Sequence, residues 1–403
     1  MNIFDQLLAD NQIPKFVRVR HEMDHSHIDD IEGAVAQAMR REGTLDRIKP
    51  GDSVCITAGS RDVANIARII RAICDQVKSV GAHPFIIPAM GSHAGAKAEG
   101  QRGIIEGYGV TEEAMGAPIR ASMDTEVIAH SKSGLEIHLD KFANAADFLI
   151  PVGRIKAHTD FRGEVESGIC KMLVIGMGKQ HGAYQCHKLG FKSMAANVKE
   201  FAGAIIEKKP NMFAIGLIEN AYHQTCRIEA IPAGRILEEE PPLLEYAKSR
   251  MAKVPFDQAD ILFVDETGKD ISGAGMDPNV TGRSPVLGIS RPFFQRIAVF
   301  DLTDKSHGNF GGLGSADVTT QRLYRKIDFE QTYPNGITAA EPLAVRLPAV
   351  MPSDRTAMQF ALRTATDCDW EKGPRIVWLK NTLSLSEFYI SEALIPEIGR
   401  AHV

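Results

Sequence analysis

The sequence predicts an α/β protein of two α/β domains with largely parallel sheets and an active-site crevice between them. Three observations support this. Short β-branched runs alternate with longer periodic segments, the alternation restarts near residue 257, and 403 residues are enough for two cores. We therefore expect an N-terminal domain over residues 1–256 that carries the reaction site, and a C-terminal α/β domain over residues 257–403 that closes over it.

In the first domain, strand and helix candidates alternate twice. The first set is a strand at 53–58 (SVCITA), an amphipathic helix at 63–81 and a strand at 84–89 (PFIIPA). The second set is a strand at 148–152 (FLIPV), a helix near 193–208 and a strand at 213–218 (FAIGLI). This order indicates parallel strands joined by crossover helices, with ligands beyond the carboxyl ends of the strands. The loops after residues 58, 89 and 152 are therefore the places where we expect a site.

The second domain begins with a new strand candidate. The run ADILFVDETG at 259–268 follows PPLLEYAKSRMAKVPFDQ, and IAVFDLT at 297–303 and RIVWLK at 375–380 come after it. These strand candidates are short apolar runs like those of the first domain, and they place the domain boundary at 250–257.

Composition and charge exclude several functional classes. The chain has 46 basic and 51 acidic residues, a net charge of −5, and no long block of either sign, so neither nucleic acid nor an anionic membrane is an expected partner. The N-terminus has no basic, apolar leader, and no run approaches the roughly 18 apolar residues of a membrane span. Six separated cysteines lack a C-x-x-C pair, so we expect reduced thiols and a cytoplasmic protein.

Two residues follow the first two strand candidates. Arg61, in TAGSRDV, lies where a helix is expected to start, and its guanidinium can form two hydrogen bonds with a substrate carboxylate. The alternative is a solvent-exposed arginine. His93, in MGSHAG, lies among small residues that allow a ligand close to the backbone; the alternative is a capping or loop histidine. No dinucleotide fingerprint and no phosphate-binding GxxxxGK[ST] loop occur, so NAD and ATP are not indicated.

Residues 153–187, which follow the third strand candidate, contain the largest number of candidate site residues. It contains His158, His181 and His187, and places Lys171 in an apolar run. Histidine exchanges protons near neutral pH and also ligates metals. An amine among apolar residues becomes more nucleophilic, whereas the alternative is a lysine that extends to solvent from a helix edge. His181 and His187 are six positions apart and do not share a helical face, so one of them is a bystander.

Several of these motifs together resemble the nickel-dependent lactate racemase family. They are GSH at 91–93, GRIKAH at 153–158, a lysine at 171 and a histidine at 187, in the order typical of that family. The resemblance implies a nickel-pincer nucleotide, nickel pyridinium-3,5-bisthiocarboxylic acid mononucleotide, that is tethered through Lys171. It also implies His187 as the nickel ligand, in preference to His181, and His93 and His158 as the acid/base pair.

The resemblance further implies Arg61 as the residue that orients the substrate, with a looser match for Gln321 and Lys326 in the second domain. Ala58 stands where the family usually has an aspartate, so we expect a 2-hydroxy acid other than lactate. The expected partners are that small acid and the enzymes that make the cofactor. A homo-oligomer is compatible with the sequence.

The residue types are suited to this chemistry independently of the family resemblance. Inverting a carbon that carries hydrogen, hydroxyl and carboxylate by hydride transfer needs a hydride acceptor, a base for the hydroxyl proton of each enantiomer, and an anchor for the carboxylate. His93 and His158 suit the two bases. We therefore predict an isomerase that racemises or epimerises a 2-hydroxy acid. Two alternatives stay open: a zinc- or iron-dependent hydrolase or lyase in which His93, His158 and His187 are metal ligands, and a non-catalytic ligand-binding protein.

Overall fold

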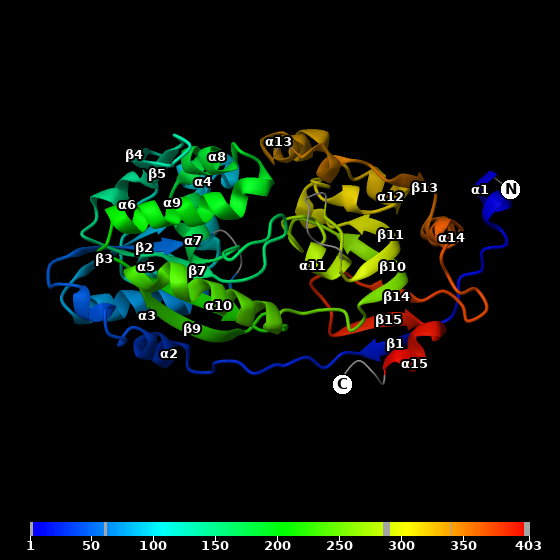
Figure 1. Cartoon of the computed structure of the whole chain (residues 1–403), viewed down its shortest axis with the longest axis horizontal. Helices are drawn as coiled ribbons and strands as arrows, with labels where there is room; N and C mark the ends of the chain where they lie inside the picture. The colour runs from blue at the N-terminus through cyan, green and yellow to red at the C-terminus, as the bar shows by residue number, and fades with distance from the viewer. Residues whose placement is uncertain (1–2, 60–62, 285–290, 340, 399–403) are drawn as a thin grey trace. The chain divides into compact units, whose positions relative to one another are not determined.

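The computed structural model describes residues 3–59, 63–284, 291–339 and 341–398 (Figure 1). Contacts divide the chain into two compact units, one of residues 24–251 and one of residues 1–23 with 252–403. The N-terminal segment joins the second unit because β1 (Phe16–Arg20) pairs with β15 (Glu387–Ser391). This division differs from the predicted one, which kept residues 1–256 together. The class is confirmed as mixed α/β with mostly parallel sheets.

The unit of residues 24–251 contains the elements that carry most of the candidate residues. Its strands are β2 (Ser53–Ala58), β3 (His83–Pro88), β4 (Thr125–His130), β5 (Glu136–Asp140), β6 (Phe148–Ile150), β7 (Val152–Arg154), β8 (Phe213–Glu219) and β9 (Thr225–Pro232). Its helices are α2 (Ile31–Ala38), α3 (Ile66–Ser79), α4 (Ala98–Gly107), α5 (Glu112–Met115), α6 (Lys141–Ala145), α7 (Ile169–Lys171), α8 (Lys179–His187), α9 (Met194–Lys208) and α10 (Ile236–Arg250).

Strands β2, β3 and β6 pair in parallel in the order β3-β2-β6, and β7 pairs in parallel with β8. Both faces of β2 are covered, because Val54 and Ile56 pack into a core with α2 and α3, whereas Cys55 packs into a second core with α7, α9 and α10. Figure 1 shows α3 and α9 on opposite sides of these strands. Burial on both faces explains the uninterrupted apolar run SVCITA, which is typical of a parallel strand.

Helix α3 shows why the sequence folds this way locally. It buries Ile66, Ile69, Ile70, Ile73 and Val77, at the three- and four-residue spacing of one helical face. The packing of this stripe on β2 and β3 fixes where the strands end. The loops that follow β2, β3 and β7 therefore start from a rigid framework.

The other unit is a seven-stranded sheet in the order β1-β15-β14-β10-β11-β12-β13. Its remaining strands are β10 (Gln258–Thr267), β11 (Phe293–Leu302), β12 (Val318–Thr320), β13 (Ala349–Met351) and β14 (Ile376–Leu379). Its helices are α1 (Ile3–Leu8), α11 (Pro278–Thr281), α12 (Gln321–Tyr324), α13 (Phe329–Ala339), α14 (Asp354–Thr364) and α15 (Ile395–Ile398). The strands β10 to β14 are parallel, whereas β15 pairs antiparallel both with β14 and with the edge strand β1. Within the described part of the chain, no helix combines the length and apolar character that a membrane crossing requires.

The predicted strands at 53–58, 84–89, 213–218, 259–268, 297–303 and 375–380 all correspond to strands, within a few residues at their ends. The predicted helices at 63–81 and 193–208 are α3 and α9. The predicted strand at 148–152 is interrupted at Pro151, which separates β6 from β7. Each half pairs with a different neighbour, β2 for β6 and β8 for β7.

Candidate functional site

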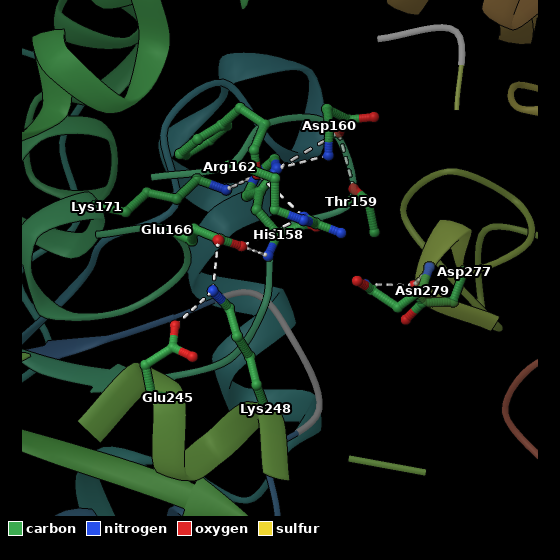
Figure 2. A network of polar contacts seen from close by, with 11 residues as sticks. His158, Thr159, Asp160, Arg162, Glu166, Lys171, Glu245, Lys248, Asp277 and Asn279 are labelled. Carbon is green, nitrogen blue, oxygen red and sulfur yellow. Dashed lines mark hydrogen bonds and ion pairs between the residues drawn. The ribbon is translucent and has the colours of Figure 1, made fainter. Parts of the chain in front are cut away.

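His158 lies in the loop that follows β7, and its side chain is only 11% exposed. Its Nε2 is 2.6 Å from Nζ of Lys171, and its Nδ1 accepts a hydrogen bond of 2.9 Å from the backbone N–H of Asp160. The ring also stacks on Phe161, with 4.2 Å between centroids. Figure 2 shows Lys171 reaching toward the His158 ring. The site therefore brings together two residues that the sequence analysis selected separately.

Burial and the neighbouring positive groups keep the His158 imidazole neutral. Desolvation lowers its pKa well below the ordinary 6.5, and the positive charges of Lys156 and Arg162 lower it further. A charged imidazole would lack water and lie among other cations. His158 is therefore a neutral hydrogen-bonding group at pH 7.

The backbone of His158 is held by a fully buried carboxylate. Glu166 is 0% exposed, and its Oε2 accepts from the His158 N–H at 2.7 Å. Its Oε1 is 3.0 Å from Nζ of Lys248 in α10, and Arg162 lies 3.3 Å from Oε2 (Figure 2). A buried charge needs such partners, because unpaired burial would cost several kcal/mol. Glu166 thus links the His158 loop to α10.

We expect Glu166→Ala to lower the free energy of unfolding by about 3 kcal/mol, because it leaves the His158 N–H without its acceptor and Lys248 without its buried partner. Glu245→Ala is the matched control, since Glu245 pairs with the same lysine at 2.8 Å but is 71% exposed. It should change stability by less than about 0.5 kcal/mol. Urea unfolding of both variants measures this; equal losses would show that Glu166 does not anchor the loop.

Lys171 ends α7 and directly precedes a π-helical turn, η3 (Met172–Gly176). The start of α7 is fixed by Glu240 of α10, whose buried Oε2 accepts from the Cys170 N–H at 2.8 Å. Gly168 permits this contact, because a Cβ there would lie 2.0 Å from Glu240 Oε1. Single π-helical turns often occur at functional sites. Here the turn connects Lys171 to the helix that carries His187.

His187 is in the last turn of α8, and its Nδ1 lies 2.6 Å from the carbonyl oxygen of Ala183. A carbonyl only accepts, so Nδ1 carries the proton and Nε2 carries the lone pair of the neutral ring. Burial lowers the pKa of His187, the bond to Ala183 opposes this, and Lys171 adds to the lowering. A backbone carbonyl that fixes the tautomer is a common feature of metal-ligating histidines.

His181 lies elsewhere on α8. It is exposed and stacks on His138 of β5, with 5.7 Å between ring centroids. His187 instead contributes to the electrostatic surroundings of His158. The six-residue spacing thus separates the two imidazoles, as the sequence predicted.

His93 follows β3 and is exposed. Its loop is fixed by buried Gln101 of α4, whose Nε2 donates to the carbonyl oxygens of Gly91 at 2.8 Å and His93 at 3.3 Å. The Gly91 N–H donates to the carbonyl oxygen of Gly176 at 3.4 Å. Gly91 has φ +61°, and a Cβ there would lie 3.2 Å from Ile175. The His93 loop thus packs by its backbone against the π-helical turn after Lys171.

The three predicted substrate contacts are Arg61, Gln321 and Lys326. Arg61 lies outside the described residues. Gln321 and Lys326 belong to the other unit, where Gln321 accepts from Arg325 at 3.3 Å. Lys326 pairs with Asp301 at 3.1 Å, among other local contacts. Within their unit, both side chains take part in local interactions.

Among the described residues, no three His, Cys, Asp or Glu side chains are placed to hold a metal ion. The six cysteines are free thiols, and burial raises the pKa of Cys74 and Cys186 to about 12. Both thiols are therefore protonated at neutral pH. The described residues therefore do not form the three-histidine centre that the hydrolase alternative requires.

Comparison with known proteins supports the same interpretation. Residues 4–198 match the family model of the lactate racemase N-terminal domain. The matched region contains His93, His158, Lys171 and His187. Gln321 and Lys326 lie beyond the lactate racemase N-terminal domain.

Two solved structures resemble the whole chain. The lactate racemase apoprotein from Thermoanaerobacterium thermosaccharolyticum has a TM-score of 0.55 and 16% identity, with 91% of this chain and 94% of that chain covered. A protein from Thermotoga maritima has a TM-score of 0.46 and 11% identity, with 87% of each chain covered. The first likeness shows a related fold over most of the chain. No curated protein matched in a sequence search.

Several polar residues of the lactate racemase N-terminal domain were not found from the sequence. They are Gln101, Asp160, Arg162 and Glu166, together with Glu240 and Lys248 after the matched region. Glu166 and Glu240 have no local signal, because a charged residue in a loop or on a helix is usually solvated. Among these residues only Asp160 and Arg162 had a sequence signal, because they closely follow His158.

His158 also predicts how stability depends on pH. Its folded pKa lies below 6.5, so between that value and pH 6.5 the unfolded chain binds a proton that the folded chain does not. The free energy of unfolding should therefore fall as the pH drops below about 6.5. Urea unfolding at several pH values measures this, and His158→Gln should weaken the dependence. His83→Gln, at an exposed histidine, should leave it unchanged; equal dependence in all three proteins would contradict the prediction.

Proposed function

We propose that this chain racemises or epimerises a 2-hydroxy carboxylic acid, using a nickel-pincer nucleotide attached to Lys171. The observation that carries the proposal is the contact of 2.6 Å between Lys171 Nζ and His158 Nε2, inside the region that matches the lactate racemase N-terminal domain. It joins the residue that would hold the group to a residue that would move a proton. The name of the family supports lactate-type acids as the substrate class.

Lys171 and His187 are the residues that would hold the nucleotide and its nickel. The His187 tautomer favours a ligand atom at Nε2, because Nδ1 is used by Ala183. The amine of Lys171 lies beside His158, at the end of α7. When bound, the group supplies a reversible hydride acceptor.

His158 would handle the hydroxyl proton. Removal of a hydride from C2 gives a keto acid only if a base also takes the proton from the hydroxyl. The Nε2 atom of His158 is the candidate, because it is the ring nitrogen that lies beside Lys171, where the nucleotide would be attached. The neutral state of His158 allows it to accept a proton in one direction and return it in the other.

His93 would serve the opposite face of the planar keto acid. Its loop packs against the turn that follows Lys171, through Gly91 and Gly176. The expected roles of Arg61, Gln321 and Lys326 in holding the substrate remain part of the proposal. The carboxylate of the acid would be held by a guanidinium or ammonium group.

The test uses full-length protein produced together with the enzymes that make the cofactor. A panel of single-enantiomer 2-hydroxy acids, deuterated at C2, would be incubated with it and separated on a chiral column. We expect at least one acid to form both configurations with deuterium kept at C2. Loss of deuterium to solvent would indicate proton abstraction at carbon and would contradict the proposal, as would nickel bound without a nucleotide.

A further inference from the structure

The hydrogen bonds around His158 fix the position of its proton. Nδ1 is 2.9 Å from the backbone nitrogen of Asp160, and a backbone N–H can only donate. Nδ1 must therefore carry a lone pair. In a neutral imidazole the proton then lies on Nε2.

This tautomer determines the state of Lys171. Nε2–H points at Nζ of Lys171 across 2.6 Å, so Nζ must accept the hydrogen bond. An ammonium group has three donors and no lone pair, whereas a neutral amine can accept. Two N–H groups directed at each other would repel. Only the neutral amine is compatible with both contacts of the His158 ring.

We propose that, before the nucleotide is attached, His158 donates Nε2–H to Lys171 and holds its amine neutral as a prepared nucleophile. The inference rests on the proposed function in one respect, that Lys171 is where a group becomes attached. It gives His158 a second role, earlier than any proton transfer with substrate.

The surroundings favour a neutral pair. The side chain of His158 is 11% exposed, and Lys171 is only partly exposed. A positive charge on either group would meet the other cations nearby and little water. The titratable groups that act on the pair include Lys156, Asp160 and Arg162 from the His158 loop. Cys186 and His187 act on it from α8.

The attachment step can be written with its atoms balanced. The lone pair of Nζ attacks the carbonyl or thiocarbonyl carbon of an activated acyl compound, and the N–C bond forms as the bond from carbon to the leaving group breaks. The attacking nitrogen loses one proton, which goes to the leaving group or to solvent. No oxidant or reductant is involved.

Attachment would reverse the hydrogen bond. An amide nitrogen has an N–H and no available lone pair, so acylated Lys171 can donate to His158 but cannot accept from it. Nε2 then becomes the acceptor, and the ring proton can move to Nδ1 only if the Asp160 N–H, which donates to that atom before attachment, turns away. The carboxylate of Asp160, whose Oδ2 is 3.8 Å from Nδ1, is the acceptor available there. Nε2 would thus gain the lone pair of a base only after Lys171 is loaded.

The experiment is competitive acetylation of the full-length apoprotein with a trace of acetic anhydride, followed by peptide mass spectrometry. Lys248, which forms ion pairs with Glu166 and Glu245, is the internal reference for an ammonium group. We expect the acetylation rate of Lys171 to change less than twofold between pH 7 and 8, whereas Lys248 should gain about tenfold, as an ammonium does below its pKa. Because each lysine is compared with itself at two pH values, the different solvent accessibility of Lys171 and Lys248 does not affect the result.

Two variants assign the effect to His158. His158→Phe keeps a ring but removes the donor, so Lys171 should become dependent on pH in the way Lys248 is. Asp160→Asn keeps the backbone N–H and should leave Lys171 as in the natural protein. A tenfold rise for Lys171 in the natural protein, or an equally flat profile in His158→Phe, would overturn the proposal.

A spectroscopic measurement keeps the test independent of folding in the variants. Selective ¹⁵N-histidine labelling should show His158 with an unprotonated Nδ1 and a protonated Nε2 in the apoprotein, and the opposite pattern after Lys171 is acetylated. The apoprotein showing Nδ1–H would overturn the proposal. Neither experiment needs nickel or nucleotide. A neutral Lys171 that never acquires the nucleotide would therefore refute the proposed function alone, and attachment to a charged Lys171 would refute this inference alone.

Discussion

Replacing Lys171 with alanine is expected to abolish attachment of the nucleotide and to reduce turnover of any 2-hydroxy acid at least about a thousandfold, because the covalent anchor and its contact with His158 are both lost. Intact-protein mass spectrometry of protein made with the cofactor enzymes gives the first readout, as an added mass on the natural chain that is absent from Lys171→Ala. Chiral separation of the product gives the second.

The controls for this prediction separate anchoring from charge. Lys171→Arg keeps a long basic side chain but cannot form the same amide, so it should behave like Lys171→Ala. Lys199→Ala removes a lysine that is 43% exposed and pairs with Glu164, and it should retain both added mass and turnover. An added mass that persists in Lys171→Ala would place the attachment elsewhere and would remove the main support for the proposed function.

Much of the framework was predictable because it depends on local patterns. The runs that form β2, β3 and β10 are apolar enough to be buried on both faces, and α3 repeats its isoleucines at helical spacing. The hairpin of β4 and β5 was not anticipated. Its first strand is largely exposed, so it lacks the continuous apolar run that marks the buried strands.

The site was predictable to a smaller extent. The position of His158 after a strand and the interval between Lys171 and His187 selected residues that do lie together. The groups that hold them were not predictable, because Glu166 meets Lys248 and Glu240 meets Cys170 only through the packing of α10 on α7 and the His158 loop. The direction of the bond between His158 and Lys171 depends on a single backbone N–H, which no sequence pattern encodes.

The second large effect concerns Gly178, between the π-helical turn and α8. A Cβ on Gly178 would lie 2.1 Å from the backbone oxygen of Val174, far closer than van der Waals contact, and 3.1 Å from Cα of Gly182. Backbone atoms cannot move aside as a flexible side chain can. Gly178→Ala must therefore shift α8, and it should lower the free energy of unfolding by roughly 3 kcal/mol, at the upper end of ordinary overpacking.

Gly103→Ala is the matched control for Gly178→Ala, because a Cβ on Gly103 in α4 meets nothing within 4 Å. It should stabilise the protein by about 0.5–1 kcal/mol, through the higher helix propensity of alanine. Urea unfolding followed by circular dichroism measures both variants. Both tryptophans, Trp370 and Trp378, belong to the other unit, so their fluorescence reports that unit separately. Equal stability of the two variants would show that the turn tolerates a shift, and the spacing from Lys171 to His187 would then not depend on a glycine at 178.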